Sequence, residues 1–307
     1  MKKNLLSTSF NIKTDLKHVS IPYLDRTDLI PEISNGSVIS PRSLSAYSRF
    51  VQLERYQIST NFSKNIVSDL LHFHGIDAGS IMESTIYHEF SVKKESLLYS
   101  LYLENARVKL EPLESKFGGW VRKKLFSGKD FHHYINDLNR ESSSKAIDLI
   151  YEACFRINDS CGFGPGNFVV LSPRICTLIR DDIRFTPDDI QLNNSINIEM
   201  VGHLNYGVNI EVYINPNLSW DNTTIIVGRS NGEELENGTY IIDKNDSPTI
   251  ETMESLGHRP GDVTRGIHYM AVGNISVEST DSRFMRIDIA SGKKPFWRKL
   301  LYLFGVE

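Results

Sequence analysis

The chain has 307 residues, of which 40% are hydrophobic and 23% are charged, and its formal net charge is -4. This composition is typical of a globular protein with one or two domains, and it excludes a global positive field for binding nucleic acid. Three cysteines argue against a disulfide framework, and the sequence has neither a signal-peptide core nor a run of roughly 20 apolar residues to span a membrane. We therefore expect a soluble protein from a reducing compartment.

Residues 1–45 are rich in Ser, Asn and Pro and predict an extended arm. Pro22, Pro31 and Pro41 recur about ten residues apart, with only short apolar groups between them. Such a segment has little apolar surface to bury by itself, so we expect a neighbouring subunit to support it. The next element is a strand, which the pattern of apolar residues predicts over Tyr47–Ile58.

Two helices are predicted after this strand. The first covers Asn61–His74 and ends at Gly75, with Ile66, Leu70 and Phe73 on its apolar stripe. The second is capped by Asp77 and continues to about Asn105, on the order of 40 Å in length. Its predicted apolar positions are Met82, Ile86, Phe90, Leu97 and Leu101.

The segment 106–140 is basic and aromatic and is interrupted by glycines. Its basic and aromatic residues are Phe117, Trp120, Arg122, Lys123, Lys124, Phe126, Lys129 and Phe131. Stacking on nucleic acid is one interpretation of this composition. An inter-subunit loop or a solvated cationic face is favoured, because the segment is short and matches no known binding module.

A further helix is predicted over Ser143–Asp159. It has one apolar face and is capped by the Ser142–Ser144 run. The predicted face consists of Ile147, Ile150, Cys154 and Ile157. A buried strand over Phe168–Leu171 follows, and Ser172 caps the next helix with Pro173 at its first position.

The remainder of the chain predicts mainly strands and turns. Strict alternation marks the strand Val208–Ile214, and later strands are predicted at Ile225–Val227, Tyr240–Ile242, Ile267–Val272 and Arg283–Ile289. In the last strand, Met285, Ile287 and Ile289 face one way and Arg286 and Asp288 face the other. Helices early and a mixed sheet late indicate an α+β class.

No catalytic, cofactor-binding or metal-binding residue is predicted. Gly162–Gly166 follows a helix and has no Gly-Lys-Ser or Gly-Lys-Thr, so a turn is favoured over a phosphate loop. The pairs His72 with His74 and His132 with His133 do not have the spacing of a zinc helix.

Two nucleophile–histidine pairs are conceivable, Cys154 with His133 and Ser172 with His203, but only their residue types support them. A core position for Cys154 and a helix cap for Ser172 are favoured. Pairs of carboxylates such as Asp181–Asp182, Asp188–Asp189 and Glu233–Glu234 lie beside turn residues, where solvated loops explain them.

Several separate stretches of the chain share one resemblance. They are Ser68–Ala78, Gly164–Ser172, Val201–Pro216 followed by Ile226–Arg229, and Arg265–Tyr269. In this order, over about residues 47–290, they resemble the major capsid proteins of T-even-type tailed bacteriophages, which have the Hong Kong 97-type capsid fold.

The resemblance implies a particular domain order. It consists of an N-terminal arm and the start of an extended hairpin loop (1–45), the return strand of that loop and a peripheral domain with a spine helix at 77–105 (46–164), an axial domain (165–255), closing strands of the peripheral domain (256–292), and a basic aromatic C-terminal tail (293–307). Members of this family usually carry a cleaved leader and an inserted domain, for which the residues before Tyr47 leave no room. Shell maturation by a dedicated protease is therefore not expected here.

The resemblance also implies self-assembly. Such proteins form hexamers and pentamers in an icosahedral or prolate head around phage DNA, in a virion assembled in the host bacterial cytoplasm. The implied partners are other copies of the chain, portal, vertex or decoration proteins, and packaged DNA in weak non-specific contact, without a membrane. Expected assembly contacts are Phe50, Arg55, Trp120, Arg122, Lys123, Lys124, Arg229, Arg265, Phe296, Trp297, Arg298 and Lys299.

Alternatives remain open at this point. Residues 293–307 are unlike the family, and docking on a neighbouring subunit is favoured over contact with DNA or a membrane. Deletion of this tail should then impair assembly. The chain is alternatively a vertex or other minor shell protein, a cellular compartment shell, or a soluble hydrolase with an unrecognised site.

Overall fold

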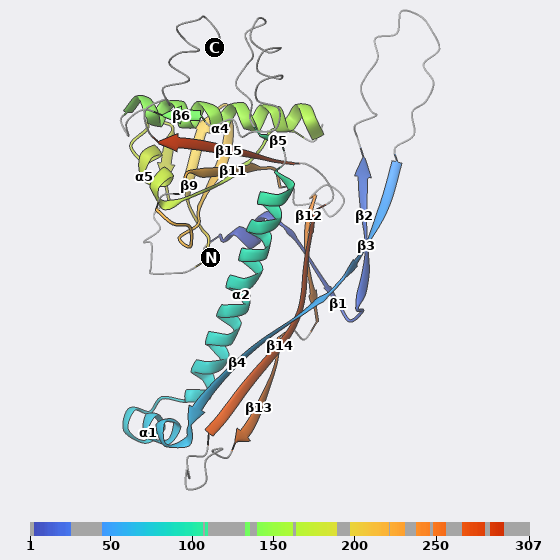
Figure 1. Cartoon of the computed structure of the whole chain (residues 1–307), viewed down its shortest axis with the longest axis vertical. Helices are drawn as coiled ribbons and strands as arrows, with labels where there is room; N and C mark the ends of the chain where they lie inside the picture. Colours follow the sequence, from blue (N-terminus) through green and yellow to red (C-terminus); the bar gives the residue numbers. More distant parts are fainter. Residues whose placement is uncertain are drawn as a thin grey trace, which may run out of the picture.

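The structure is a computed structural model that describes residues 3–25, 45–106, 108–109, 133–135, 140–161, 164–188, 197–220, 222–230, 238–245, 248–255, 266–279 and 283–291. Two mixed sheets are joined by one long helix, and a two-stranded hairpin stands beside them (Figure 1). The predicted α+β class is confirmed. Within the described residues, no helix has both the length and the apolarity that a membrane crossing requires.

Two helices at the start of the body form as their capping residues predict. Helix α1 spans Lys64–His74, and Gly75 ends it with a φ of 63°, which a glycine adopts without strain. Helix α2 spans Ala78–Asn105, and the Asp77 side chain accepts a hydrogen bond from Gly79 N over 3.0 Å. With 28 residues, α2 is about 42 Å long.

The five-stranded sheet lies along the first half of α2. It consists of β1 (Phe10–Thr14), β4 (Glu54–Ser63), β12 (Thr239–Lys244), β13 (Thr249–Ser255) and β14 (Gly266–Ser279). The long strand β14 pairs antiparallel with β4, β12 and β13, whereas β1 pairs parallel with β12. Met82, Ile86 and Phe90 of α2 are buried against Ala271 and Ile275 of β14.

The eight-stranded sheet takes the second half of α2 on one face and two helices on the other. Its strands are β5 (Val108–Lys109), β6 (His133–Ile135), β7 (Phe168–Leu171), β8 (Phe185–Pro187), β9 (Glu199–Tyr206), β10 (Val208–Ile214), β11 (Thr224–Gly228) and β15 (Phe284–Ser291). Helices α4 (Arg140–Cys161) and α5 (Pro173–Ile179) cover the face opposite α2. Strand β7 contributes to both cores, because Val169 and Leu171 face α4 whereas Phe168 and Val170 face α2.

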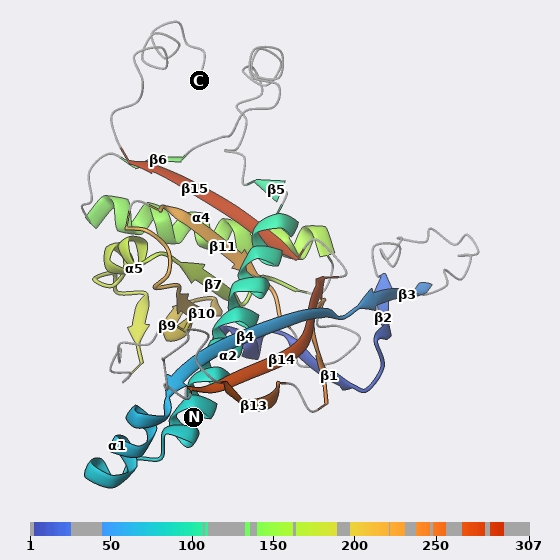
Figure 2. The same ribbon diagram turned by 60° about the horizontal axis from the view of Figure 1, so that its bottom comes forward.

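Strands β2 (His18–Asp25) and β3 (Ser45–Gln52) form the hairpin. They pair antiparallel over their full length, from His18 opposite Gln52 to Asp25 opposite Ser45. The hairpin lies on the far side of the molecule from α1 in both views (Figures 1 and 2).

Several predicted elements are confirmed. Helix α4 includes Ser143–Asp159, and all four residues of its predicted apolar face are fully buried. Strands β7, β10, β11, β12, β14 and β15 lie where alternation or apolar runs predict them. Met285 and Ile287 face α4, as the alternation in β15 predicts.

Three predictions are wrong in detail. The strand predicted over Tyr47–Ile58 is two strands, β3 and β4, which are interrupted at Leu53. Helix α4 begins at Arg140, so Ser142–Ser144 lie inside its first turn and do not cap it. The helix predicted from Asn61 begins at Lys64, because Asn61–Ser63 still belong to β4. Seven strands were not predicted: β1, β2, β5, β6, β8, β9 and β13.

The expectation that a neighbouring subunit supports the N-terminal arm is wrong for its first part, which packs on its own chain. Leu5 and Ile21 are both fully buried, and β1 joins the five-stranded sheet. An isolated apolar residue can be buried by packing against residues that are distant in the sequence. A local window of sequence does not show these packing partners. The sheets also divide the chain differently from the boundaries at 165 and 255, since β12 and β13 lie in the five-stranded sheet and β15 lies in the other.

Candidate assembly surfaces

The hairpin β2–β3 is the first candidate surface. Its base packs on the body, where Ile21 and Val51 are buried with Tyr240 and Ile242 of β12. Because side chains alternate along a strand, Phe50 points the other way, and 79% of it is exposed. The aromatic ring of Phe50 is therefore exposed to solvent, on a strand whose other face packs against the body of the same chain.

Arg49 ties the hairpin to the body by polar contacts. Arg49 Nη1 donates to Ser279 O over 3.1 Å, and Arg49 Nη2 lies 3.5 Å from Glu278 Oε2. In the described part of the chain, no third strand pairs with β2 or β3. A two-stranded ribbon is marginally stable alone, and its unpaired edges offer backbone groups to another chain.

The corner between α1 and α2 is the second candidate surface. Four large apolar residues are exposed there by 39% to 79%: Leu71, Phe73, Ile76 and Ile81. Phe73 was predicted on the apolar stripe of α1, and its exposure shows that the described part of the chain leaves this end of the stripe uncovered. A cluster of exposed apolar residues on a monomer marks an interaction site or a liability to aggregate.

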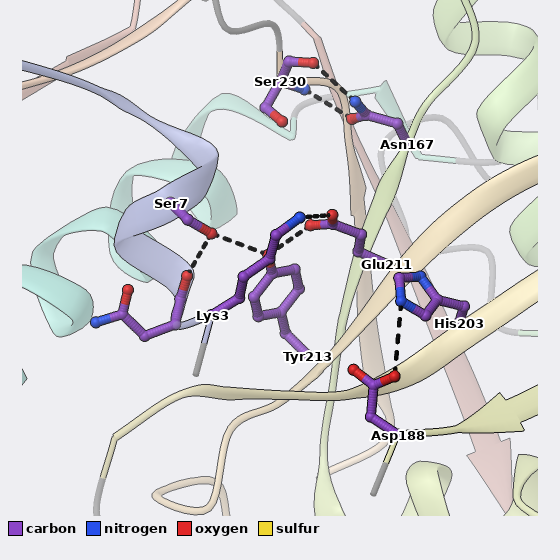
Figure 3. A network of polar contacts seen from close by, with 9 residues as sticks. Lys3, Ser7, Asn167, Asp188, His203, Glu211, Tyr213 and Ser230 are labelled. Atoms are coloured by element: carbon purple, nitrogen blue, oxygen red, sulfur yellow. Dashed lines mark hydrogen bonds and ion pairs between the residues drawn. The ribbon is translucent and has the colours of Figure 1, made fainter. Parts of the chain in front are cut away.

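A polar network fastens the N-terminal residues to the eight-stranded sheet (Figure 3). Lys3 forms an ion pair with Glu211 on β10. Tyr213 Oη donates to Glu211 Oε2 over 2.7 Å and lies 3.1 Å from Ser7 Oγ. Burial and the Glu211 carboxylate together raise the pKa of Tyr213, so its hydroxyl keeps its proton.

Two other contacts in Figure 3 are structural in character. Asn167 Nδ2 donates to Ser230 O and Ser230 N donates to Asn167 Oδ1, both over 2.8 Å, which joins the entries of β7 and the exit of β11. His203 Nε2 lies 3.9 Å from Asp188 Oδ1 at the β8–β9 edge. A histidine–carboxylate pair of this length needs a nucleophile nearby before it can support acyl transfer.

The structure does not bring Ser172 to His203. The register places His203 opposite Glu211, and Glu211 opposite Phe168, so Ser172 lies two strands away and four residues along. This separation is about 16 Å from strand spacing and rise. Ser172 instead caps α5 as predicted, with its buried Oγ accepting from Ile175 N over 3.4 Å.

Cys154 lies on the buried face of α4, in the core, as predicted. Burial raises the pKa of its thiol to about 12, so it is not a thiolate at neutral pH. For its conceivable partner His133, only the backbone in β6 is described. Among the described residues, no group of His, Cys, Asp or Glu side chains is arranged to hold a metal ion.

The expected assembly residues divide into three groups. Phe50 and Arg55 are exposed, on β3 and β4. Arg229 makes contacts within its own chain: its guanidinium packs over Gly164, and Nη1 donates to Pro165 O over 2.7 Å. The remaining residues lie outside the described ranges: Trp120, Arg122, Lys123, Lys124, Arg265, Phe296, Trp297, Arg298 and Lys299.

Comparison with known proteins adds similarity to solved structures. No protein-family model matches the chain, and no curated protein matches it. It is similar to a structure from Microbacterium phage Oxtober96 (12% identity over 94% of this chain and 92% of that chain, TM-score 0.47). Similar values hold for the capsid structure of cyanophage P-SCSP1u (9%, 95% and 89%, 0.49). They also hold for the holo-SrpI encapsulin complex of Synechococcus elongatus PCC 7942 (11%, 95% and 90%, 0.49). Similarity at this level assigns no function by itself.

Proposed function

We propose that the chain is the structural protein of a closed shell, the major capsid protein of a tailed bacteriophage head. The observation that carries this proposal is the pair of exposed apolar surfaces at opposite sides of one chain. The hairpin presents Phe50, and the α1–α2 corner presents Phe73 and its neighbours. Both surfaces lie on slender elements that extend from the two cores.

Two unlike surfaces on opposite sides favour a particular kind of assembly. If the hairpin of one copy covers the α1–α2 corner or the sheet edge of the next copy, the contact is head-to-tail. Head-to-tail contacts repeat with one rotation and close into rings when that rotation divides the circle. Hexamers and pentamers are such rings, and the same loop and corner serve in both with a small change of angle.

Contacts of this kind gain strength by number. Burial of one phenylalanine contributes about 2 kcal/mol, or roughly a 30-fold change in an association constant. A subunit in a ring makes each contact twice, and a shell closes many rings at once. Individually weak contacts then hold a stable container.

The fold divides naturally under this proposal. The five-stranded sheet with the first half of α2 is the peripheral part, and the eight-stranded sheet with α4 and α5 is the axial part. The hairpin β2–β3 is the extended loop, and α2 is the spine that joins both sheets. This division rests on sheet membership and core packing, and it supports a Hong Kong 97-type architecture.

The proposed partners follow from this role. Other copies of the chain come first, and portal, vertex or decoration proteins and packaged DNA are the others. The formal charge of -4 fits a container whose lining does not bind its DNA tightly. In this role the activity of the protein is geometric, and no turnover of a substrate is expected.

Three exposed phenylalanines allow a matched test. Phe50 on the hairpin and Phe73 at the corner are each 79% exposed, and Phe155 on the outer side of α4 is 52% exposed. Electron microscopy and sedimentation of the purified protein should show rings, tubes or closed shells. Phe50→Ala and Phe73→Ala should each reduce the assembled fraction by at least tenfold, because each change removes roughly 2 kcal/mol per contact.

Phe155→Ala is the control for the loss of any exposed aromatic ring, and it should assemble as the unmodified chain does. Circular dichroism should be the same for all three variants. A monomeric unmodified protein at high concentration would contradict the proposal, as would equal assembly of all three variants.

A further inference from the structure

The residues Lys3–Ser9, which we call the N-terminal clasp, occupy a seat between α2 and the eight-stranded sheet. Leu5 is fully buried in the same core as Tyr102 and Tyr213. Leu5 N donates to Ile198 O over 3.0 Å, and Met200 N donates to Lys3 O over 3.1 Å. The clasp therefore continues the pairing of the chain that enters β9.

Side chains fix the clasp at both of its ends. Thr8 Oγ1 lies 2.7 Å from Tyr102 Oη on α2 and also donates to Leu5 O over 2.7 Å. Lys3 pairs with Glu211 at the other end. The clasp is therefore a short segment that hydrogen bonds and the Lys3–Glu211 ion pair hold to the rest of the chain. These contacts would be lost if the clasp detached.

Glu95 lies under this seat, in the middle of α2. It is 1% exposed, and its Oε2 accepts from Ile198 N over 2.7 Å. Its neighbour Lys94 points to the other sheet, where Nζ lies 2.5 Å from Asp243 Oδ2. Adjacent residues of α2 therefore bind the two sheets, Lys94 by an ion pair and Glu95 by a hydrogen bond.

Burial opposes a charge on Glu95 more strongly than its hydrogen-bond donors favour one. Burial raises the pKa of Glu95 to about 7, the Ile198 N–H opposes this rise, the Glu199 carboxylate adds to it, and the Asn4 side chain opposes it. Two lysines of this region pair with other carboxylates, Lys94 with Asp243 and Lys3 with Glu211. Within the described residues, no ion pair reaches Glu95.

We propose that this seat is a proton-sensitive joint, in which protonated Glu95 holds the clasp and the start of β9 to α2 and ionised Glu95 releases them. When Glu95 is ionised, a buried negative charge lies beside Glu199. Opening of the seat lets water hydrate this carboxylate and so lowers its free energy. An opened seat frees Lys3–Ser9 and loosens the attachment of β9 to the long helix.

The direction with pH follows from linkage. The closed seat binds the Glu95 proton more tightly than the open seat, whose carboxyl has an ordinary pKa. Proton binding therefore stabilises the closed seat fully below about pH 4.5, and this stabilisation is lost as the pH rises to about 7. The joint is tight in acid and loose in mild alkali.

Amide hydrogen exchange of the full chain, read by mass spectrometry, tests this inference. The protection factor of the peptide that contains Lys3–Ser9 corrects for the intrinsic effect of pH on exchange. From about pH 5 to about pH 8 it should fall by roughly tenfold to a hundredfold. Peptides from β7 and α4 should keep their protection over the same range.

Glu95→Gln separates titration from mere packing. Glutamine still accepts from Ile198 N and cannot ionise, so the clasp should stay protected at all these pH values. Glu89→Gln, at an exposed position of the same helix, should behave as the unmodified chain does. If Glu95→Gln does not fold, the carboxyl NMR signal of Glu95 in the unmodified chain must titrate near pH 7 together with loss of clasp protection.

Protection that is independent of pH in the unmodified chain would overturn the inference, as would an unchanged pH dependence in Glu95→Gln. The experiment reads contacts within one chain, so its outcome is independent of whether shells form. A failure here leaves the proposed function standing, and the reverse also holds.

Discussion

The eight-stranded sheet and the hairpin β2–β3 differ in how far their side chains are buried. All four residues of β7 are buried, with alternate residues facing α2 and α4. On β3, the described side chains from Tyr47 to Gln52 are exposed except Val51. The sheet is complete within one chain, whereas the hairpin leaves one of its faces and its edges open.

This difference separates two kinds of consequence. A substitution in the sheet changes the free energy of unfolding of the single chain. A substitution on the open face of the hairpin leaves that free energy nearly unchanged and changes association instead. The same chemical change made in the two regions therefore distinguishes a folding role from an assembly role.

Phe168→Ala should give the largest effect on the single chain. Phe168 is 1% exposed, and its ring centroid lies 5.5 Å from that of Tyr102 and 6.3 Å from that of Phe284. Loss of this ring should lower the free energy of unfolding by about 3 to 5 kcal/mol in denaturant titrations. Phe50→Ala, the same change on the hairpin, should lower it by less than about 0.5 kcal/mol. Equal losses at both positions would mean that the hairpin is part of the core.

Local signals predicted most helices correctly. Asp77 caps α2, Gly75 ends α1, and Ser172 with Pro173 begins α5, because each of these contacts lies within a few residues of sequence. Strand β1 was not predicted, because its partner is remote: Phe10 lies opposite Tyr240. A strand of five residues with a distant partner carries too little local pattern to be recognised.

The candidate surfaces were predictable only in part. Phe50 was expected at an assembly contact; it is 79% exposed, and the contact itself stays a prediction. Phe73 was assigned to the apolar stripe of α1, and the apolar period of an amphipathic helix is the same whether its own body or another copy covers it. The seat of Glu95 was not predicted, since a glutamate within a helical pattern is usually solvated.

Arg184→Lys should give an intermediate effect within the body. Arg184 Nε and Nη2 bind the two oxygens of Asp182 over 2.9 and 3.0 Å, and Nη1 lies 2.6 Å from Asp148 Oδ1 on α4. These carboxylates raise the pKa of Arg184, so its charge is permanent. Lysine cannot reproduce the paired bonds, and the free energy of unfolding should fall by about 1 to 2 kcal/mol.

Arg156→Lys is the matched control for Arg184→Lys. Its pair with Glu152 spans one turn of α4, and both side chains are 32% exposed. The loss should be below about 0.5 kcal/mol. Comparable losses in the free energy of unfolding would show that the Arg184 bonds between α4 and the α5–β8 turn stabilise the fold no more than a surface ion pair does.

Arg49→Ala should give the smallest effect on global stability and an effect confined to the hairpin. The Arg49 side chain is 55% exposed, so its ion pair with Glu278 is screened by water and contributes less than about 0.5 kcal/mol. The hydrogen bond to Ser279 O nevertheless links β3 to β14. Its loss should speed amide exchange in β2 and β3 about twofold, with β7 unchanged.

Arg55→Ala, on the adjacent strand β4, should leave the exchange of the hairpin unchanged. If Arg49→Ala also leaves it unchanged, the packing of Ile21 and Val51 alone holds the hairpin to the body, and the open face is then positioned by apolar contact without a polar anchor.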